Sequence, residues 1–152
     1  MIYKVNPLIY ELDYSKYSNN INEKYIEIIK KDEKNRMIIS CVDNIDDNQI
    51  ISFIIYRKIV LKNEINFIIL LISVHEDFRS NGYGKIILDE FINYIYNIRS
   101  KKNINIIIHP LDSSEEFFIS YGFEKIKRSR FLKNYEGYSS NKDILLYKLK
   151  IK

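Results

Sequence analysis

Hydrophobic residues recur along the chain with two periods, one typical of strands and one typical of helices. The β-rich runs 49–61 and 65–74 flank three polar residues, 62–64, which predicts two strands joined by a tight hairpin. Apolar residues at helical spacing predict a helix over roughly 20–31 and another over the residues that follow Gly84. Further strands are expected at 37–42, 104–108, 123–131 and 143–151.

A short helix is predicted between the strands at 104–108 and 123–131. Ser113 and Glu116 have the spacing of a capping box at its start. Phe117, Phe118 and Tyr121 are expected on its buried side, and Gly122 suits the left-handed conformation at its end. With a partly helical start, this order of elements predicts an α/β fold with a mixed sheet, in one domain over residues 1–152.

The composition is typical of an intracellular globular protein. The chain has 152 residues, of which 46% are hydrophobic, enough to form a core. A single cysteine, Cys41, excludes a disulfide within the chain. The longest apolar run, 67–74, has about half the length that a bilayer requires, and no basic-then-apolar leader opens the sequence. We therefore expect a soluble, cytoplasmic protein that does not enter a membrane.

The net charge of +4 is concentrated in one segment. Residues 124–133 contain five bases and one acid, while the remaining 19 bases and 19 acids cancel. Such a run is either a solvated face or a site for an anionic partner. Nucleic acid is not favoured as that partner, because Phe131 is the only aromatic residue interleaved with the bases.

Residues 79–84, RSNGYG, lie between a predicted strand and a predicted helix. Glycines there allow a turn in which several N–H groups point the same way, next to a helix N-terminus, which is a suitable arrangement for binding an anion. The segment is not a nucleotide P-loop, because Gly84-Lys85 is followed by Ile86, and it lacks the third glycine of a dinucleotide fingerprint at Ile87.

The sequence ISVHEDFRSNGYGKIIL, residues 72–88, resembles motif A of the GCN5-related N-acetyltransferases (GNAT), Gln/Arg-x-x-Gly-x-Gly/Ala. The sequence FFISYGFEK, residues 117–125, resembles the family's motif B, Phe/Leu-Tyr-x-x-x-Gly-Phe. The resemblance covers roughly residues 49–125. It implies a mixed, mostly antiparallel sheet of six to seven strands, with helices on both faces. One strand would carry a bulge and separate from its neighbour in a V-shaped splay. Bulges beside active sites can redirect the side chains and main-chain groups there.

The resemblance further implies that acetyl-CoA is the cosubstrate and that no metal takes part. Backbone amides of one turn would hold its pyrophosphate: Arg79, Ser80, Asn81, Gly82, Tyr83 and Gly84. The preceding strand residues Ile72, Ser73 and Val74 would pair with the pantetheine arm through main-chain hydrogen bonds. Three residues of the short helix would also contact the cosubstrate: Ser114, Phe117 and Phe118.

In the reaction that the resemblance implies, a neutral primary amine attacks the thioester directly. The amine must first lose a proton, so a base or a chain of waters is required. The tyrosine that in the family donates to the leaving thiolate is replaced by Phe118, which leaves Tyr121, Tyr135 and Tyr138 as candidate donors. His109, at the end of a predicted strand, is a candidate base because its ordinary pKa is suitable.

The spacing of His109 and Phe118 resembles that of glucosamine-6-phosphate N-acetyltransferases, in which an acidic residue stands nine positions before the motif B tyrosine. The acidic pair of those enzymes is absent, because Leu70 and Leu71 occupy its positions. A phosphorylated amine would be bound by the basic residues Arg128, Arg130 and Lys133. Two alternative functions remain: a protein N-terminal or lysine acetyltransferase, and a CoA-binding module without catalysis. The protein could also form a homodimer.

Overall fold

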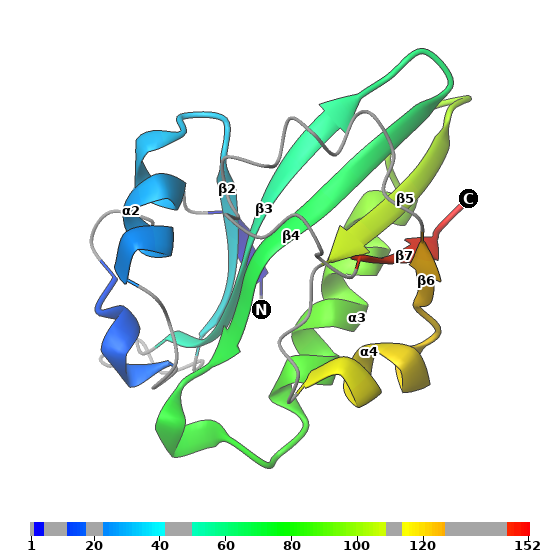
Figure 1. Ribbon diagram of the computed structural model, residues 1–152. Coiled ribbons are helices and arrows are strands. Elements are labelled where there is room, and N and C mark those ends of the chain that lie inside the picture. The colour runs from blue at the N-terminus through cyan, green and yellow to red at the C-terminus, as the bar shows by residue number, and fades with distance from the viewer. Residues whose placement is uncertain (1, 5–11, 18–22, 42–49, 109–113, 127–145) are drawn as a thin grey trace.

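Seven strands form one mixed sheet in the computed structural model of the chain, in the order β1-β2-β3-β4-β5-β7-β6 (Figure 1). The structure describes residues 2–4, 12–17, 23–41, 50–108, 114–126 and 146–152. The strands are β1 (Ile2–Lys4), β2 (Arg36–Cys41), β3 (Ile50–Val60), β4 (Glu64–Val74), β5 (Asn103–Ile108), β6 (Glu124–Ile126) and β7 (Leu146–Lys150). The helices are α2 (Glu23–Lys31), α3 (Tyr83–Tyr96) and α4 (Glu115–Tyr121), with 3-10 turns η1 (Tyr14–Lys16) and η2 (Glu76–Phe78).

All neighbouring strands are antiparallel except β4 and β5, which are parallel and are joined through α3. A parallel pair needs such a crossover connection, whereas β3 and β4 are joined by a short hairpin closed by a hydrogen bond from the Leu61 N–H to the Glu64 carbonyl, at 2.8 Å. The prediction of a mixed, mostly antiparallel sheet of six to seven strands is therefore confirmed.

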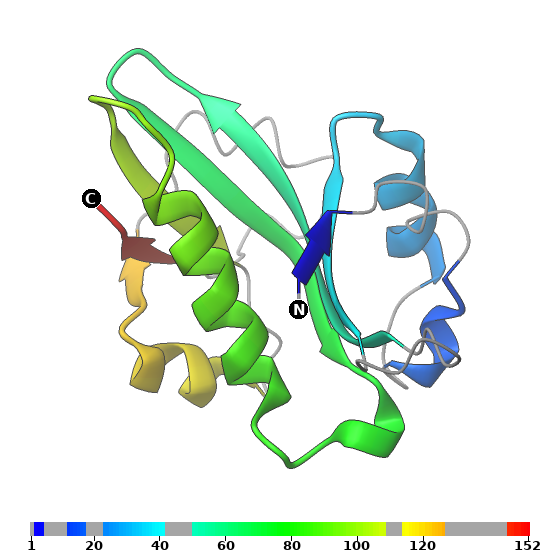
Figure 2. The same ribbon diagram turned by 180° about the vertical axis from the view of Figure 1, so that it is seen from behind.

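Helices cover both faces of the sheet (Figures 1 and 2). Successive side chains of a strand point to opposite faces, so each central strand contributes to two hydrophobic clusters. Phe53 and Ile55 of β3 belong to the cluster under α2, and Ile54 and Tyr56 belong to the cluster under α3 and α4. The long apolar runs in the sequence thus correspond to strands that are buried on both faces.

Where the structure describes them, the predicted helices and strands are present, with differences at their ends. The short strand β1 was not predicted. Helix α3 begins at Tyr83, so Gly84 lies inside its first turn, and the helix ends at Tyr96. Ser114 precedes α4, and its side chain makes no capping hydrogen bond. The predicted capping box begins at Ser113, which lies outside the described residues. The predicted strand and loop over 127–145 lie outside them too.

Aromatic packing helps to attach helix α3 to the sheet, which gives a test of the fold. The fully buried Phe91 ring lies 4.9 Å from the Tyr56 ring and 6.0 Å from the Phe67 ring, measured between centroids. We expect Phe91→Ala to lower the free energy of unfolding by about 3–5 kcal/mol in urea denaturation. The control Ile119→Ala removes a side chain that is 51% exposed and should cost less than about 0.5 kcal/mol. Equal losses for the two variants would contradict this packing.

Candidate functional site

Strand β4 is paired on both sides only along its first half. Residues 64–69 pair with 103–108 of β5, while the pairing with β3 continues to Val74. The register with β3 shifts between Ile69 and Leu71, which makes Leu70 the extra residue of a β-bulge. Beyond the bulge, residues 70–74 pair with no strand on the β5 side within the described part of the chain, and the two ribbons diverge (Figure 1). The bulge and the splay implied by the resemblance are present.

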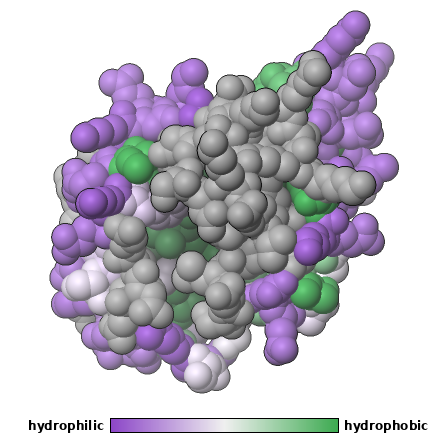
Figure 3. All heavy atoms as spheres, in the orientation of Figure 1, coloured by the Kyte–Doolittle hydropathy of each residue, from purple (hydrophilic) through white to green (hydrophobic). Residues whose placement is uncertain are grey.

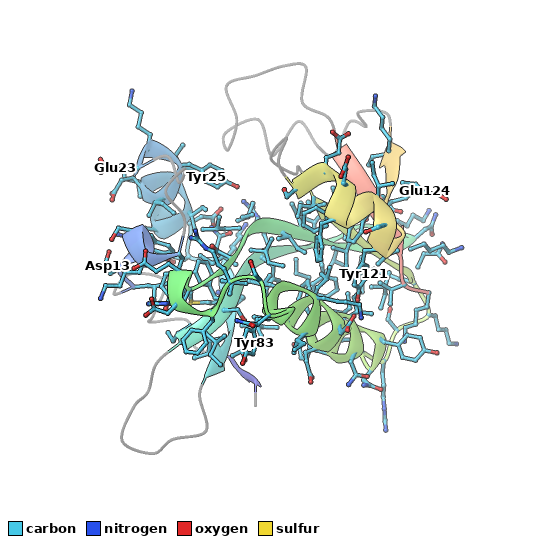
Figure 4. All side chains as sticks on the ribbon, turned by 90° about the horizontal axis from the view of Figure 1, so that it is seen from below. Asp13, Glu23, Tyr25, Tyr83, Tyr121 and Glu124 are labelled. Atoms are coloured by element: carbon cyan, nitrogen blue, oxygen red, sulfur yellow. The ribbon has the colours of Figure 1, made fainter. Side chains whose placement is uncertain are left out.

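A side chain of helix α2 stabilises the bulge. A bulge leaves a backbone group outside the ladder, and such a group needs another hydrogen-bond partner when it is buried. The Tyr25 hydroxyl of α2 donates a hydrogen bond to the Leu70 carbonyl at 2.6 Å. Figure 4 shows Tyr25 extending from α2. This contact fixes the point at which β4 turns away from β5.

After β4 the chain forms η2 and then a tight loop. His75 precedes η2, and its Nδ1 accepts a hydrogen bond from the Asp77 N–H at 3.1 Å. The loop then places two residues at positive φ, Ser80 at 63° and Gly82 at 81°. Because a left-handed φ disfavours residues with a Cβ, Gly82 is the residue that this turn requires. The loop leads directly into α3.

The start of α3 presents a group of backbone donors. The first hydrogen bond within the helix runs from the Ile86 N–H to the Gly82 carbonyl, at 3.1 Å. The N–H groups of the four residues 82–85 precede that bond and have no acceptor inside the helix. They also lie at the positive end of the helix dipole. Such a helix start binds phosphate groups well.

Gly84 leaves room beside these donors. A Cβ at this position would have Val74 Cγ2 as its nearest neighbour, at 3.8 Å, an ordinary contact. Neither the backbone conformation nor crowding within the chain therefore requires a glycine here, although glycine costs helix stability relative to alanine. A glycine that the described part of the fold does not need, next to backbone donors that have no acceptor within α3, is consistent with a ligand approaching the backbone closely.

The Ser73 and Arg79 side chains hold the loop in place. Both donate to the Tyr17 carbonyl at 2.6 Å, Ser73 through Oγ and Arg79 through Nη2, and Arg79 Nε also lies 3.5 Å from the Val74 carbonyl. Tyr17 is itself anchored, since it is buried and its hydroxyl donates to the Ile50 carbonyl at 2.9 Å. Ser73 and Arg79 can thus offer a ligand their main-chain groups, while their side chains connect the loop to the segment before α2.

Tyr121 links the two helices on the other side of the site (Figure 4). Its hydroxyl donates a short hydrogen bond to Asp89 of α3, and the same carboxylate accepts from Lys85 Nζ at 3.1 Å. The hydrogen bond from Tyr121 is the main cause that lowers the pKa of Asp89, and the one from Lys85 adds to it. Burial, followed by the Asp89 contact, raises the pKa of Tyr121. To donate its proton to a leaving thiolate, Tyr121 would have to break this hydrogen bond.

The other predicted contacts on α4 differ in their exposure. Phe118 is only 2% exposed and packs between the rings of Phe117 and Phe123, at 5.0 and 5.4 Å, which leaves little of its surface for a cosubstrate. Phe117 and Ser114 are half-buried. The remaining predicted site residues lie outside the described residues: His109, Arg128, Arg130, Lys133, Tyr135 and Tyr138. Their roles stay predictions.

Sequence reasoning missed three residues that shape the site, namely Tyr17, Tyr25 and Asp89. Tyr25 fits the apolar face of its helix and Asp89 the polar face of α3, so the pattern of polarity predicts only burial and exposure for them. Each acts through a hydrogen bond to a residue at least 32 positions away. Such contacts depend on the tertiary structure, and no short motif encodes them.

The described residues contain neither a cluster of metal ligands nor a membrane-spanning helix. Among the residues that the structure describes, no three His, Cys, Asp or Glu side chains gather as metal ligands would. Within the same residues, no helix combines the length and the apolarity needed to span a bilayer. The groups that the site offers are the donors at the start of α3, the open edge of β4 and the side chains of α4.

A protein-family model and several solved structures match this chain. Residues 13–136 match the family model described as acetyltransferase (GNAT) domain. The GCN5 structure from Tetrahymena aligns with a TM-score of 0.69 and 16% identity, covering 96% of this chain and 88% of that one. The ribosomal-protein-S18-alanine N-acetyltransferase from Escherichia coli aligns with a TM-score of 0.60 and 16% identity, covering 100% and 94%.

A third structure contains a glucosamine N-acetyltransferase region of a fungal multi-domain β-N-acetylglucosaminidase. It aligns with a TM-score of 0.57 and 11% identity, covering 84% of this chain and 17% of that one. A search of curated protein sequences finds no significant match. At these identities the structural matches establish the fold, and the family model establishes the family.

The Asp89–Tyr121 contact predicts a pH-dependent effect on stability. At neutral pH, Tyr121→Phe should lower the free energy of unfolding by about 0.5–1.5 kcal/mol, the typical value of a hydrogen bond. The folded-state pKa of Asp89 lies below its ordinary value of 3.8, so this contribution is present above that pH and is lost as the pH falls through the folded-state pKa. The difference between wild type and variant should therefore shrink in acid.

Urea denaturation at several pH values measures this difference. The control Tyr96→Phe removes a hydroxyl from a side chain that is 56% exposed and should change stability little at any pH. A Tyr121→Phe variant whose deficit does not change between neutral and acidic pH would show that the hydroxyl does not act through Asp89.

Proposed function

The chain belongs to the acetyltransferase (GNAT) family and is an acetyl-CoA-dependent N-acetyltransferase, and on this premise we propose that its acceptor is a small phosphorylated primary amine such as glucosamine 6-phosphate. The product would be N-acetylglucosamine 6-phosphate, made in the cytoplasm for amino-sugar metabolism by a single domain over residues 1–152. The cosubstrate would bind along β4 and at the start of α3.

The backbone donors at the start of α3 are the observation that supports the cosubstrate site. The N–H groups of residues 82–85 would bind the pyrophosphate of acetyl-CoA, and the space next to Gly84 would admit it. The open edge of β4 beyond the bulge would pair with the pantetheine arm through residues 72–74. The thioester would then lie near the bulge at Leu70, where the splay from β5 begins.

Transfer requires a deprotonated amine, an electrophilic carbonyl and a leaving thiolate. The nitrogen–carbon bond would form first and give a tetrahedral oxyanion, which main-chain N–H groups at the splay would stabilise, and the carbon–sulfur bond would then break to release the thiolate. His109 would accept the proton of the amine. Tyr135 or Tyr138 would donate to the thiolate, which can also leave unprotonated because thiol pKa values are only moderately above neutral. Tyr121 is a weaker candidate, because its hydroxyl already donates a hydrogen bond to Asp89.

The charge of the segment after α4 is the observation that supports an anionic acceptor. The whole net charge of the sequence is found in residues 124–133, which begin on β6, where Lys125 is exposed. Strand β6 lies at the edge of the sheet, and its pairing with β7 places its last residue toward the end of β5 at which the splay opens. Arg128, Arg130 and Lys133 would bind the phosphate, arginine in bidentate fashion.

A protein or peptide acceptor is the second candidate. The short hairpin between β3 and β4 and the tyrosine-rich segment with Tyr135 and Tyr138 resemble peptide-facing loops of protein acetyltransferases. The S18-alanine enzyme, whose title names a protein substrate, shares the fold over nearly its whole length. Turnover of peptides with a free N-terminus, without turnover of sugar phosphates, would support this alternative.

The space next to Gly84 provides a test of the cosubstrate site. Gly84→Ala should keep the stability of the protein or raise it by up to about 1 kcal/mol, because the position is helical and uncrowded. Gly84 is the last position of motif A, at which alanine also occurs, so we expect the Kd for acetyl-CoA to change little in calorimetry when only a methyl group is added. Gly84→Glu, which also adds a negative charge, should abolish binding.

Gly122→Ala is the matched control for the two Gly84 variants. Gly122 ends α4 at a φ of 119°, and a Cβ there would lie 3.5 Å from Leu149 Cδ1, so this change should reduce stability by about 1 kcal/mol or more. Its acetyl-CoA affinity should stay unchanged. Unaltered affinity in a folded Gly84→Glu variant would refute the proposed position of the pyrophosphate.

The basic segment provides a separate test of the acceptor. Arg128→Ala or Arg130→Ala should lower kcat/KM for glucosamine 6-phosphate by roughly one to two powers of ten, the effect of losing a charged hydrogen bond. The KM for acetyl-CoA should change little. Unphosphorylated glucosamine should be a poor substrate that is insensitive to both changes. Lys34→Ala, which removes an exposed base between α2 and β2, is the control. Equal effects with both sugars would contradict phosphate binding by this segment.

A further inference from the structure

Three segments that are far apart in the sequence meet at the end of the sheet where β4 begins. The Asn103 N–H donates to the Asn63 carbonyl at 3.1 Å, and Lys102 Nζ donates to the Leu61 carbonyl at 2.9 Å. The Ile104 N–H donates to the Lys152 carbonyl at 2.7 Å. These bonds connect the β3–β4 hairpin, the turn between α3 and β5, and the C-terminal segment after β7.

The side chains of these segments form a concentrated positive surface, which we call the basic end. Its residues are positively charged and, apart from the half-buried Lys102, exposed: Lys58, Lys62, Arg99, Lys101, Lys102, Lys150 and Lys152. The one acid in segments 58–66, 98–105 and 150–152 is the half-buried Glu64, so the side-chain balance is +6. Figure 3 shows hydrophilic side chains protruding at this end, at the upper right.

The positive charges of the basic end are not neutralised by neighbouring carboxylates. None of the seven bases forms an ion pair with a carboxylate within the described part of the chain. The Glu64 carboxylate is oriented toward Asn66 and Asn105, whose side-chain amides lie at 3.2 and 3.4 Å. Several unpaired like charges at one end of a protein produce a potential that attracts anions with many charges.

An exposed aromatic ring accompanies these charges. Tyr96, the last residue of α3, is 56% exposed, and Lys152 Nζ lies 5.4 Å from its ring centre. Lysines that contact phosphates, together with an exposed ring on which a base can stack, are the features of a surface for single-stranded nucleic acid. Exposed lysines carry no fixed geometry that would read a base sequence, which favours binding to the backbone.

From this arrangement we infer that the basic end is a binding surface for the phosphodiester backbone of RNA, without sequence specificity. Strand β4 runs from the basic end to the proposed pyrophosphate site over 11 residues, or about 33 Å. RNA on this surface would therefore leave the cosubstrate site accessible. The inference does not depend on the identity of the acceptor, and it assigns to the protein a second, non-catalytic interaction.

Fluorescence anisotropy of the full chain with a labelled single-stranded RNA of about 20 nucleotides tests the inference. We expect a Kd of about 1–100 µM at physiological salt, with an affinity that falls linearly with salt on logarithmic axes. The triple variant Lys62→Gln, Lys101→Gln, Lys150→Gln should weaken binding about tenfold or more and reduce the salt slope by about 2, because each lost contact removes about 0.7. Its Tm should match that of the wild type.

Two further triple variants serve as controls. Lys16→Gln, Lys31→Gln, Lys34→Gln removes the same charge from exposed positions near α2 and should leave the affinity close to that of the wild type. Arg128→Gln, Arg130→Gln, Lys133→Gln removes charge from the other basic segment. A loss of RNA binding in either control that equals the loss at the basic end would overturn the inference. It would also fail if RNA does not bind, or if a poly-glutamate peptide binds as tightly as RNA.

Discussion

The partial pairing of β4 is the constraint on which the site depends. A strand in the middle of a sheet normally has both of its edges satisfied, but β4 has a β5 partner only as far as Ile69. The bulge at Leu70 turns the rest of the strand away, which leaves main-chain groups of a central strand open at one edge. Because α3 starts a few residues later, this open edge and the helix donors lie in succession along the chain. The candidate site consists largely of backbone.

Main-chain groups can serve a ligand only when side chains elsewhere hold the backbone in place. The segment before and within α2 does this twice, through the Tyr25 hydroxyl at the bulge and the Tyr17 carbonyl at the loop. On the other side, Asp89 and Tyr121 connect α3 to α4. Hydrogen bonds thus hold the segment of Tyr17 and Tyr25 to β4 and the loop, and hold α4 to α3. These contacts keep the backbone groups of the candidate site in position.

Local patterns in the sequence predicted most of the helices and strands and the position of the loop, and the resemblance to the GNAT family supplied the bulge and the splay. Apolar runs predicted β3 and β4 to within a few residues, and the glycine spacing at 82 and 84 identified the turn before α3. The contacts of Tyr17, Tyr25 and Asp89 could not be predicted, because they join residues that only the tertiary structure brings together. The charge balance shows the same limit: 19 bases and 19 acids outside 124–133 cancel along the chain, but they do not cancel in space at the basic end.

Amide chemical shifts of the 15N-labelled protein during titration with acetyl-CoA test the central claim most directly, because the claim concerns backbone N–H groups. We predict that the largest changes occur at residues 82–85, where phosphate oxygens would accept hydrogen bonds, with smaller changes along 70–74. Pantetheine, which lacks the pyrophosphate, should affect only the latter group. If acetyl-CoA binds while the amides of residues 82–85 do not shift, the helix start does not hold the pyrophosphate and the account of the site is wrong.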